Sequence, residues 1–152
     1  MPRFRFPLDP LIRHRKRIED QRQQALAALT RQRFEIESHV RTLHQDLLAR
    51  KAQLASRLVG PVDTNLIRDH AVAVAWTESE VRRAAVRLSD LYQRIEAARL
   101  ALLEAVKARK SLDRFREQRF QAWREDLLDR EAAAIDDLVT SRAARILQEH
   151  QS

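Results

Sequence analysis

The sequence predicts an all-α protein, a long two-helix antiparallel coiled-coil hairpin whose second helix is much longer than the first. Three observations predict this fold. The chain of 152 residues holds one Gly, four Pro and no Cys, and good helix formers such as Ala, Leu, Arg, Glu and Gln dominate it. After residue 10, strong helix-breaking signals occur only in residues 58–65. Beyond that interruption, apolar residues recur every seven positions, as in coiled coils.

Two residues mark the start of the first helix. Asp9 is a favoured N-cap residue, and Pro10 suits the first helical position because its missing N–H would be unbonded there in any case. We therefore expect a short N-terminal arm over residues 1–9 and a first helix over about 10–58. At 1.5 Å per residue this helix would be about 75 Å long, a length typical of coiled coils.

One interruption ends the first helix. Gly60 suits a helix C-cap, Pro61 prevents the helix from continuing, and Asp63 or Thr64 can cap a new helix. The sequence therefore predicts a turn over residues 59–64.

The second helix is expected over about 65–148, and it completes a single coiled-coil domain that covers residues 1–152. Its apolar stripe has a seven-residue spacing and consists of Ile67, Val74, Val81, Leu88, Ile95 and Leu102. The first helix has the same spacing at Leu29, Ile36 and Leu43. Two such stripes can be buried against each other.

The register of the hairpin follows from the residue numbers, because antiparallel partners have numbers with a constant sum. Leu43 with Val81 and Ile36 with Leu88 both add to 124. The same sum is given by three further apolar pairs, Leu58–Leu66, Leu29–Ile95 and Ile18–Val106. This agreement predicts one hairpin rather than two unrelated helices.

Aromatic residues gather where the first helix is expected to begin. The pairing sum of 124 places Phe4 opposite Phe120. Phe4 and Phe6 would then lie beside Phe115, Phe120 and Trp123. We therefore expect the N-terminal arm to clasp the longer helix.

Beyond the arm, the second helix is expected to continue alone for about 28 residues, or about 40 Å. Trp123, Leu127 and Leu138 would have no intramolecular cover there. An apolar stripe without a partner indicates an interaction surface. A frayed tail or a dimer contact would have the same pattern.

The formal net charge of +7 is unevenly distributed along the chain. Residues 1–33 carry nine Lys and Arg against three acids, and residues 106–119 carry six against two. Residues 125–137 reverse the sign, with six acids and one Arg. This balance is compatible with nucleic-acid or acidic protein partners.

The two basic stretches are expected to meet. The pairing sum places Arg15 opposite Arg109 and the run 13–17 beside the run 107–119. Such a patch favours an anionic partner, although a solvated charged face has the same composition. A nucleic-acid-binding helix would instead have aromatic residues for base stacking or a basic region that leads into a parallel zipper.

No pattern in the sequence indicates catalysis, a cofactor or a metal site. No phosphate-binding glycine motif occurs, and His39 and His44 lie five residues apart, on different sides of a helix. No stretch approaches the ~20 apolar residues that span a bilayer, so direct membrane insertion is not expected. A secretory signal is not expected either, because the N-terminus has no apolar h-region.

A Trp near the turn is a candidate binding residue. Trp76 lies about 200° around the helix from Val74, so it is expected to point away from the first helix. An exposed Trp near the turn fits a binding anchor. A Trp that lies flat along the hairpin is the alternative.

Two stretches resemble a known family. The start "FRFPLDPLIRHRKRIED" (residues 4–20) resembles the opening of the flagellar export protein family FliJ. The stretch "RKSLDRFREQRFQAWREDLLDREAAAIDDL" (residues 109–138) resembles its C-terminal signature, in which Arg130-Glu131 is followed by Asp136-Asp137-Leu138. Length, helical hairpin and polarity agree over nearly the whole chain.

The resemblance implies a non-enzymatic component of the flagellar type III export apparatus, an antiparallel coiled coil similar to the central stalk of rotary ATPases. It implies three partners: the hexameric export ATPase, the cytoplasmic domain of the export gate membrane protein, and export chaperones. The implied location is the cytoplasm, at the cytoplasmic face of the membrane at the flagellar base. Neither nucleic-acid binding nor a cofactor is implied.

The resemblance also implies positions for two binding faces. The gate-contacting face, early in the second helix, corresponds by position to Val72, Trp76 and Arg83. The ATPase-facing part is the terminal end, with Arg13, Arg15, Lys16, Arg17, Arg109, Arg116, Trp123 and Leu127. Two alternatives are the equivalent stalk of a virulence secretion system and a basic nucleic-acid-binding coiled coil.

Overall fold

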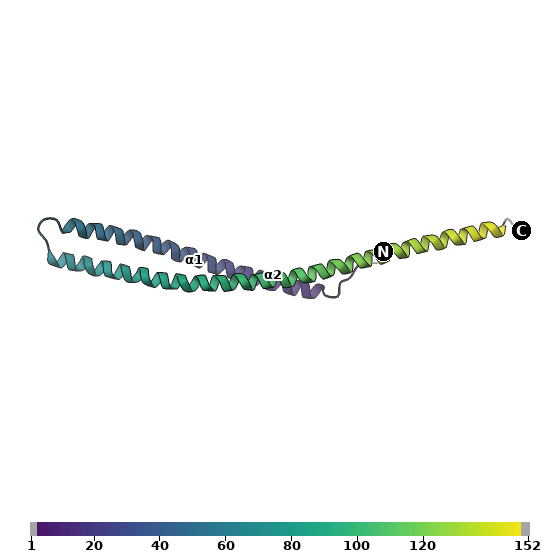
Figure 1. Cartoon of the computed structure of the whole chain (residues 1–152), viewed down its shortest axis with the longest axis horizontal. Coiled ribbons are helices and arrows are strands. Elements are labelled where there is room, and N and C mark those ends of the chain that lie inside the picture. Colours follow the sequence, from purple (N-terminus) through teal and green to yellow (C-terminus); the bar gives the residue numbers. More distant parts are fainter. Residues whose placement is uncertain (1–2, 150–152) are drawn as a thin grey trace. The chain divides into compact units, whose positions relative to one another are not determined.

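The computed structural model describes residues 3–149, and this part of the chain is all-α (Figure 1). Helix α1 spans Asp9–Arg57 and helix α2 spans Thr64–Glu149. The fold is the predicted helical hairpin with a longer second helix. Residues 1–2 of the predicted arm and His150 lie outside the described residues.

The chain forms two compact units. Unit 1 combines the residues up to Arg17 with those from Val106 onward, and unit 2 comprises Ile18–Ala105. Unit 2 therefore contains the turn and most of the paired part of both helices. Unit 1 contains the N-terminal arm, the first turns of α1 and the C-terminal half of α2.

The turn of unit 2 has the predicted residue roles. Gly60 has a φ of 93°, a left-handed conformation that residues with a Cβ rarely adopt. The side chain of Asp63 caps α2, because its Oδ1 accepts the Asn65 N–H at 3.0 Å. Asp63, rather than Thr64, is therefore the N-cap residue.

The seam of unit 2 contains two rows of side chains rather than one. The predicted stripe from Ile67 to Leu102 is partly or fully buried at every position. A second row lies three residues after each member of this stripe from Val74 onward, and consists of Thr77, Ala84, Leu91, Ala98 and Ala105. Thr77 is only 1% exposed, and its hydroxyl donates to the Ala73 carbonyl at 2.9 Å. Small side chains in one row let the helices approach closely.

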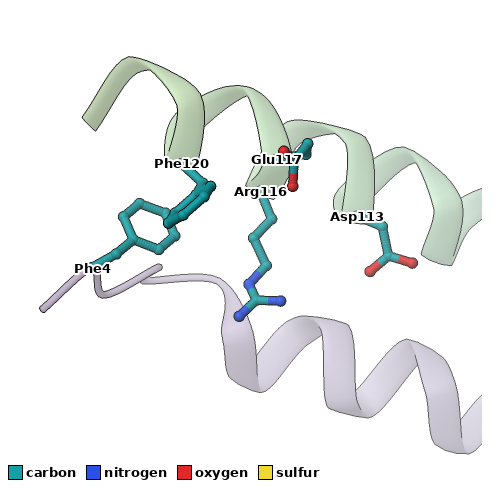
Figure 2. A pocket seen from close by; sticks show the side chains of 5 residues that line it. All are labelled: Phe4, Asp113, Arg116, Glu117 and Phe120. Carbon is teal, nitrogen blue, oxygen red and sulfur yellow. The ribbon is translucent and has the colours of Figure 1, made fainter. Parts of the chain in front are cut away.

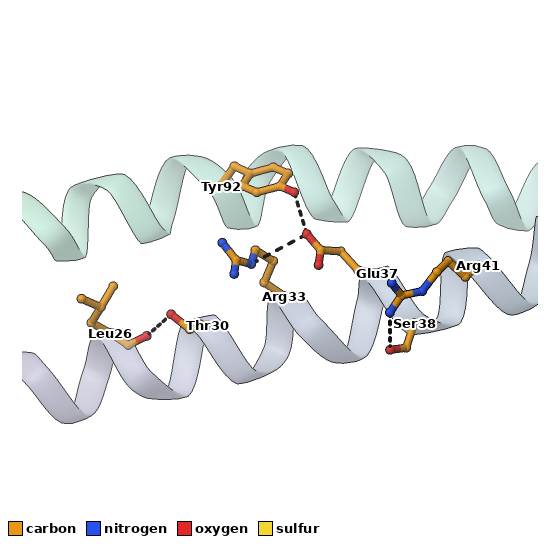
Figure 3. Close-up of polar contacts among 7 residues, drawn as sticks. All are labelled: Leu26, Thr30, Arg33, Glu37, Ser38, Arg41 and Tyr92. Carbon is orange, nitrogen blue, oxygen red and sulfur yellow. Dashed lines mark hydrogen bonds and ion pairs between the residues drawn. The ribbon is translucent and has the colours of Figure 1, made fainter.

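Two contacts across the hairpin give its register. The Tyr92 hydroxyl of α2 donates to Glu37 Oε1 of α1 at 2.7 Å, as Figure 3 shows, and Lys51 Nζ lies 3.1 Å from Glu78 Oε1. The residue numbers of both pairs add to 129. Glu37 and Lys51 on α1 each come one residue after a seam position. Tyr92 and Glu78 on α2 each come four residues after one. The seam itself therefore pairs at a sum of 124, which confirms the predicted register.

Charged side chains interrupt this seam on α1. Arg33 and Arg50 occupy seam positions, and their Nε atoms are buried with no hydrogen-bond partner among the described residues. Arg33 Nε lies 3.7 Å from Glu37 Oε1, a contact drawn in Figure 3. The Arg stems fill the seam while their buried polar atoms cost free energy. An apolar seam would make the hairpin more stable.

Unit 1 begins with residues 3–8, an arm that precedes α1. Phe6 is only 5% exposed, which makes it the most buried side chain of this arm. The Asp9 N–H donates to the Phe6 carbonyl at 3.1 Å and so fixes the junction between arm and helix. At the other end of the unit, every residue of α2 from Leu128 to Glu149 is exposed.

Candidate functional site

The N-terminal arm is held on α2 by an aromatic cluster, which consists of Phe4, Phe6, Phe115, Phe120 and Trp123. The Phe4 ring lies edge-on to Phe120, with centroids 5.3 Å apart, and 5.7 Å from the Trp123 ring. Phe6 meets Phe115 at 5.7 Å, and Phe120 stacks on Trp123 at 5.9 Å. These contacts confirm the predicted clasp. They also correct the expectation that Trp123 has no intramolecular cover, because Phe4 packs on it.

An ion pair next to the aromatic cluster joins the start of α1 to α2. Arg116 Nε lies 3.1 Å from Asp9 Oδ1. The two residues are both about half exposed, so solvent screens the pair and its contribution to stability is small. Figure 2 shows Arg116 reaching from α2 toward the start of α1, beside a hollow that Phe4 and Phe120 also line. Asp9 thus both begins α1 and binds α2.

The basic residues expected at this end divide into two groups. Arg13, Arg15, Lys16 and Arg17 are all exposed on the first turns of α1. Arg109 and Arg116 lie on α2 and bind acids of unit 1: Arg109 Nη1 lies 2.6 Å from Asp113 Oδ2, and Arg116 binds Asp9. The charges of Arg109 and Arg116 are therefore partly neutralised within the molecule.

A second basic surface lies along α2 in unit 1. A hollow of about 470 Å³ is lined by Lys107, Lys110, Ser111, Arg114, Phe115 and Gln118. Its three cations follow one face of the helix at spacings of three and four residues. All three cations belong to the run 107–119, in which only Arg109 and Arg116 were predicted to bind a partner. The spacing would have identified the three that share a face.

The last part of α2 presents apolar side chains to solvent. Leu127 is half-buried, and beyond it the exposed large apolar residues are Leu128, Ile135, Leu138, Val139, Ile146 and Leu147. The predicted exposure of Leu138 is confirmed. Most protein surfaces do not carry so many exposed aliphatic residues in one short helical stretch, so this segment is a candidate interaction surface.

The candidate gate-contacting face lies in unit 2, on the side of α2 opposite the seam. Trp76 is 61% exposed and Val72 is also exposed, so Trp76 points away from α1 as predicted. Arg83 Nη1 is bound to Glu80 Oε1 at 2.8 Å. Val86, which is 71% exposed, extends the same stripe by one turn beyond Arg83. The sequence-based prediction did not include Val86, although its spacing of fourteen residues from Val72, or two heptads, places it on the same side of the helix as Val72.

Other kinds of site are not found in the described residues. Over residues 3–149, no group of three or more His, Asp or Glu side chains is arranged to hold a metal ion. Neither helix has, within this range, a stretch apolar enough to cross a bilayer.

The comparison with known families agrees with the resemblance drawn from the two end motifs. The family model described as "Flagellar FliJ protein" matches residues 4–147. This range includes most of the arm, all of α1, nearly all of α2 and all the candidate binding residues. No curated protein and no solved structure shows a significant match to the chain.

Proposed function

We propose that this chain acts as a non-enzymatic stalk, because it belongs to the FliJ family and is therefore a component of the flagellar export apparatus. In this proposal unit 1 binds the hexameric export ATPase, and the exposed stripe of unit 2 binds the cytoplasmic domain of the export gate. The protein would also assist export chaperones, and it would act on the cytoplasmic side of the membrane at the flagellar base.

The observation that carries the proposal is the clustering of binding features in unit 1. The arm is anchored by the aromatic cluster, so the basic first turns of α1 are held close to α2. The cations of the run 13–17 remain exposed beside this anchor. Exposed cations steer an acidic partner and increase its association rate.

The proposed gate contact is supported by the stripe of unit 2. Trp76 combines a large apolar area with an indole N–H, and Trp is one of the residues that most often dominate binding energy. Val72 and Val86 flank it on the same side of α2. This stripe faces away from the seam, so a partner can bind it without opening the hairpin.

The ATPase contact is tested by charge reversal on α1. We expect Arg13/Arg15/Arg17→Glu to lower the affinity for the purified export ATPase by about tenfold or more, because three steering cations become anions. The matched control is Arg31/Arg41/Arg68→Glu, which makes the same charge change at exposed positions of unit 2. Equal loss in both variants would show that only net charge matters, and no loss in either would contradict a role for the run 13–17.

The gate contact is tested separately with Trp76→Ala. This variant should lose most of its affinity for the cytoplasmic domain of the gate protein while its circular dichroism stays helical. Phe34→Ala is the matched control, since Phe34 is an equally exposed aromatic residue on α1. Unchanged binding of Trp76→Ala would remove the stripe from the proposal.

A further inference from the structure

The C-terminal segment, residues 124–149, is an amphipathic helix whose apolar side is uncovered. At about 100° per residue, one arc of roughly 140° contains most of its large apolar side chains. These residues are Leu127, Leu128, Ile135, Leu138, Val139 and Ile146. Because all of these residues except Leu127 are exposed in unit 1, the side that would normally be buried is available to a partner.

The arc has the spacing of a coiled-coil seam. Leu128, Ile135 and Arg142 lie seven residues apart, and a second row follows each of them by three residues at Glu131, Leu138 and Arg145. Alternate spacings of three and four are the spacings of the seam in unit 2 as well. The segment therefore has two seam rows but only one helix.

The segment is complementary to itself when it is reversed. At a constant sum of 273, Ile135 of one copy faces Leu138 of another, and Glu131 faces Arg142. The next seam pair outward matches Leu128 with the stem of Arg145, which can cover an apolar neighbour. A single sum of residue numbers thus pairs apolar residues with apolar residues and an acid with a base. The sum of 124 pairs the apolar seam residues of the hairpin in the same way.

The pattern continues at the end of the segment and along its flank. Arg124 faces Glu149 at the same sum of 273, which adds a second charge pair in each half. On one flank, Val139 meets Val139 of the other copy at the two-fold axis, and Ala132 meets Ile146. The residue numbers of these flanking pairs add to 278, five more than those of the seam pairs. In unit 2 the flanking pair Glu37–Tyr92 adds to 129, which is also five more than the seam sum of 124.

We propose that the C-terminal segments of two copies of this chain pair as an antiparallel coiled coil centred between Asp136 and Asp137. The partner is a second copy, so this interface is distinct from the proposed ATPase and gate contacts. A two-fold axis makes the contact self-complementary and closed, so it yields a dimer rather than a filament.

The charges select the antiparallel arrangement. In a parallel, in-register pair, Glu131 would face Glu131 and Arg142 would face Arg142, and each like-charge pair would repel. Reversal of one helix replaces these two repulsions by two Glu131–Arg142 attractions. Because the paired segment is short, the dimer should be weak and reversible, with a dissociation constant in the ~1–100 µM range typical of small interfaces.

The first test measures the mass of the full-length protein by sedimentation velocity from micromolar to several hundred micromolar concentration. The wild type should shift from monomer to dimer with increasing concentration. Leu138→Lys should raise the dissociation constant by tenfold or more, whereas Leu147→Lys, on the opposite side of the helix, should change it by less than about threefold. A wild type that stays monomeric over the whole range would overturn the proposal.

A charge-swap cycle tests the register. Glu131→Arg alone and Arg142→Glu alone should each weaken the dimer by about tenfold, because each variant creates two like-charge pairs. The double variant Glu131→Arg/Arg142→Glu should return to within about threefold of the wild type. A double variant as weak as the sum of the single ones would overturn the antiparallel pairing.

The absence of Cys from the chain allows a direct test of the axis. Val139→Cys should be linked to a dimer by a short bismaleimide reagent, while Ala133→Cys, on the outer side, should stay monomeric. Equal cross-linking of both variants would indicate random collision and overturn the assignment. If the wild type is monomeric and Leu138→Lys loses affinity for the export ATPase, the ATPase covers this segment; the dimer is then refuted and the proposed function is not.

Discussion

Removal of the Phe6 side chain should release the N-terminal arm from α2 while leaving the hairpin folded. Phe6 is 5% exposed and its ring lies 5.7 Å from that of Phe115. Full burial of a Phe side chain contributes about 1.5–3 kcal/mol, and an edge-to-face ring pair adds about 0.5–1.5 kcal/mol. Phe6→Ala should therefore weaken docking of the arm by about 2–4 kcal/mol, or about 30- to 1,000-fold.

The release can be followed through Trp123, because Phe4 packs on that indole and leaves with the arm. In a Trp76→Phe background Trp123 is the single Trp, and its emission should shift to longer wavelength in Phe6→Ala. Hydrogen exchange of the Asp9 amide, which is bonded to the Phe6 carbonyl, should accelerate in parallel. The control Phe34→Ala removes an exposed ring and should change neither signal. An unchanged Trp123 emission in Phe6→Ala would refute the clasp.

Two further predictions concern the seam and its flank in unit 2. Arg50→Leu should raise the free energy of unfolding, measured by urea denaturation, by about 1–2 kcal/mol. The reason is that it removes a buried Nε that has no hydrogen-bond partner among the described residues. A lower free energy of unfolding would show that the Arg50 guanidinium forms hydrogen bonds in solution. The hydrogen bond to Glu37, followed by partial burial and the negative charge of Glu37, raises the pKa of Tyr92 above the ordinary tyrosine value. The folded state therefore holds this proton more tightly, so the contribution to stability is complete below about pH 10 and is lost as the pH rises through the folded-state pKa. Tyr92 is the single Tyr, so tyrosinate absorbance reports its midpoint directly, and Glu37→Gln should lower that midpoint; equal midpoints in the two proteins would exclude the bond.

The large apolar residues and the turn carried most of the information about the fold. Gly60 and Asp63 have strong local preferences, so the turn could be predicted without knowledge of tertiary contacts. The sum of 124 then gave the register, which the Glu37–Tyr92 contact confirms. Thr77 and the alanines of the second seam row were not predicted, because small side chains produce no clear hydropathy pattern. Their burial follows only from the pairing of the two helices.

The candidate site was less predictable because it depends on which charges find a partner. The sequence alone assigns no acidic partner to Arg116, but the folded protein places Asp9 Oδ1 3.1 Å from its Nε. Lys110 and Arg114, by contrast, line an open hollow on the outer face of α2. The sequence shows how many charges a segment has. It does not show which of them an acid across the helix pair has neutralised.

The central claim, that unit 1 uses exposed cations to bind an acidic partner in the export apparatus, is tested most directly by the salt dependence of ATPase binding. The affinity of the full-length wild type for the purified export ATPase should fall steeply as salt increases, since exposed charges are screened within about 10 Å at 0.1 M. Arg13/Arg15/Arg17→Glu should bind weakly and show a much flatter dependence, while Arg31/Arg41/Arg68→Glu should keep the wild-type slope. The same affinity and the same slope in all three proteins would contradict the account.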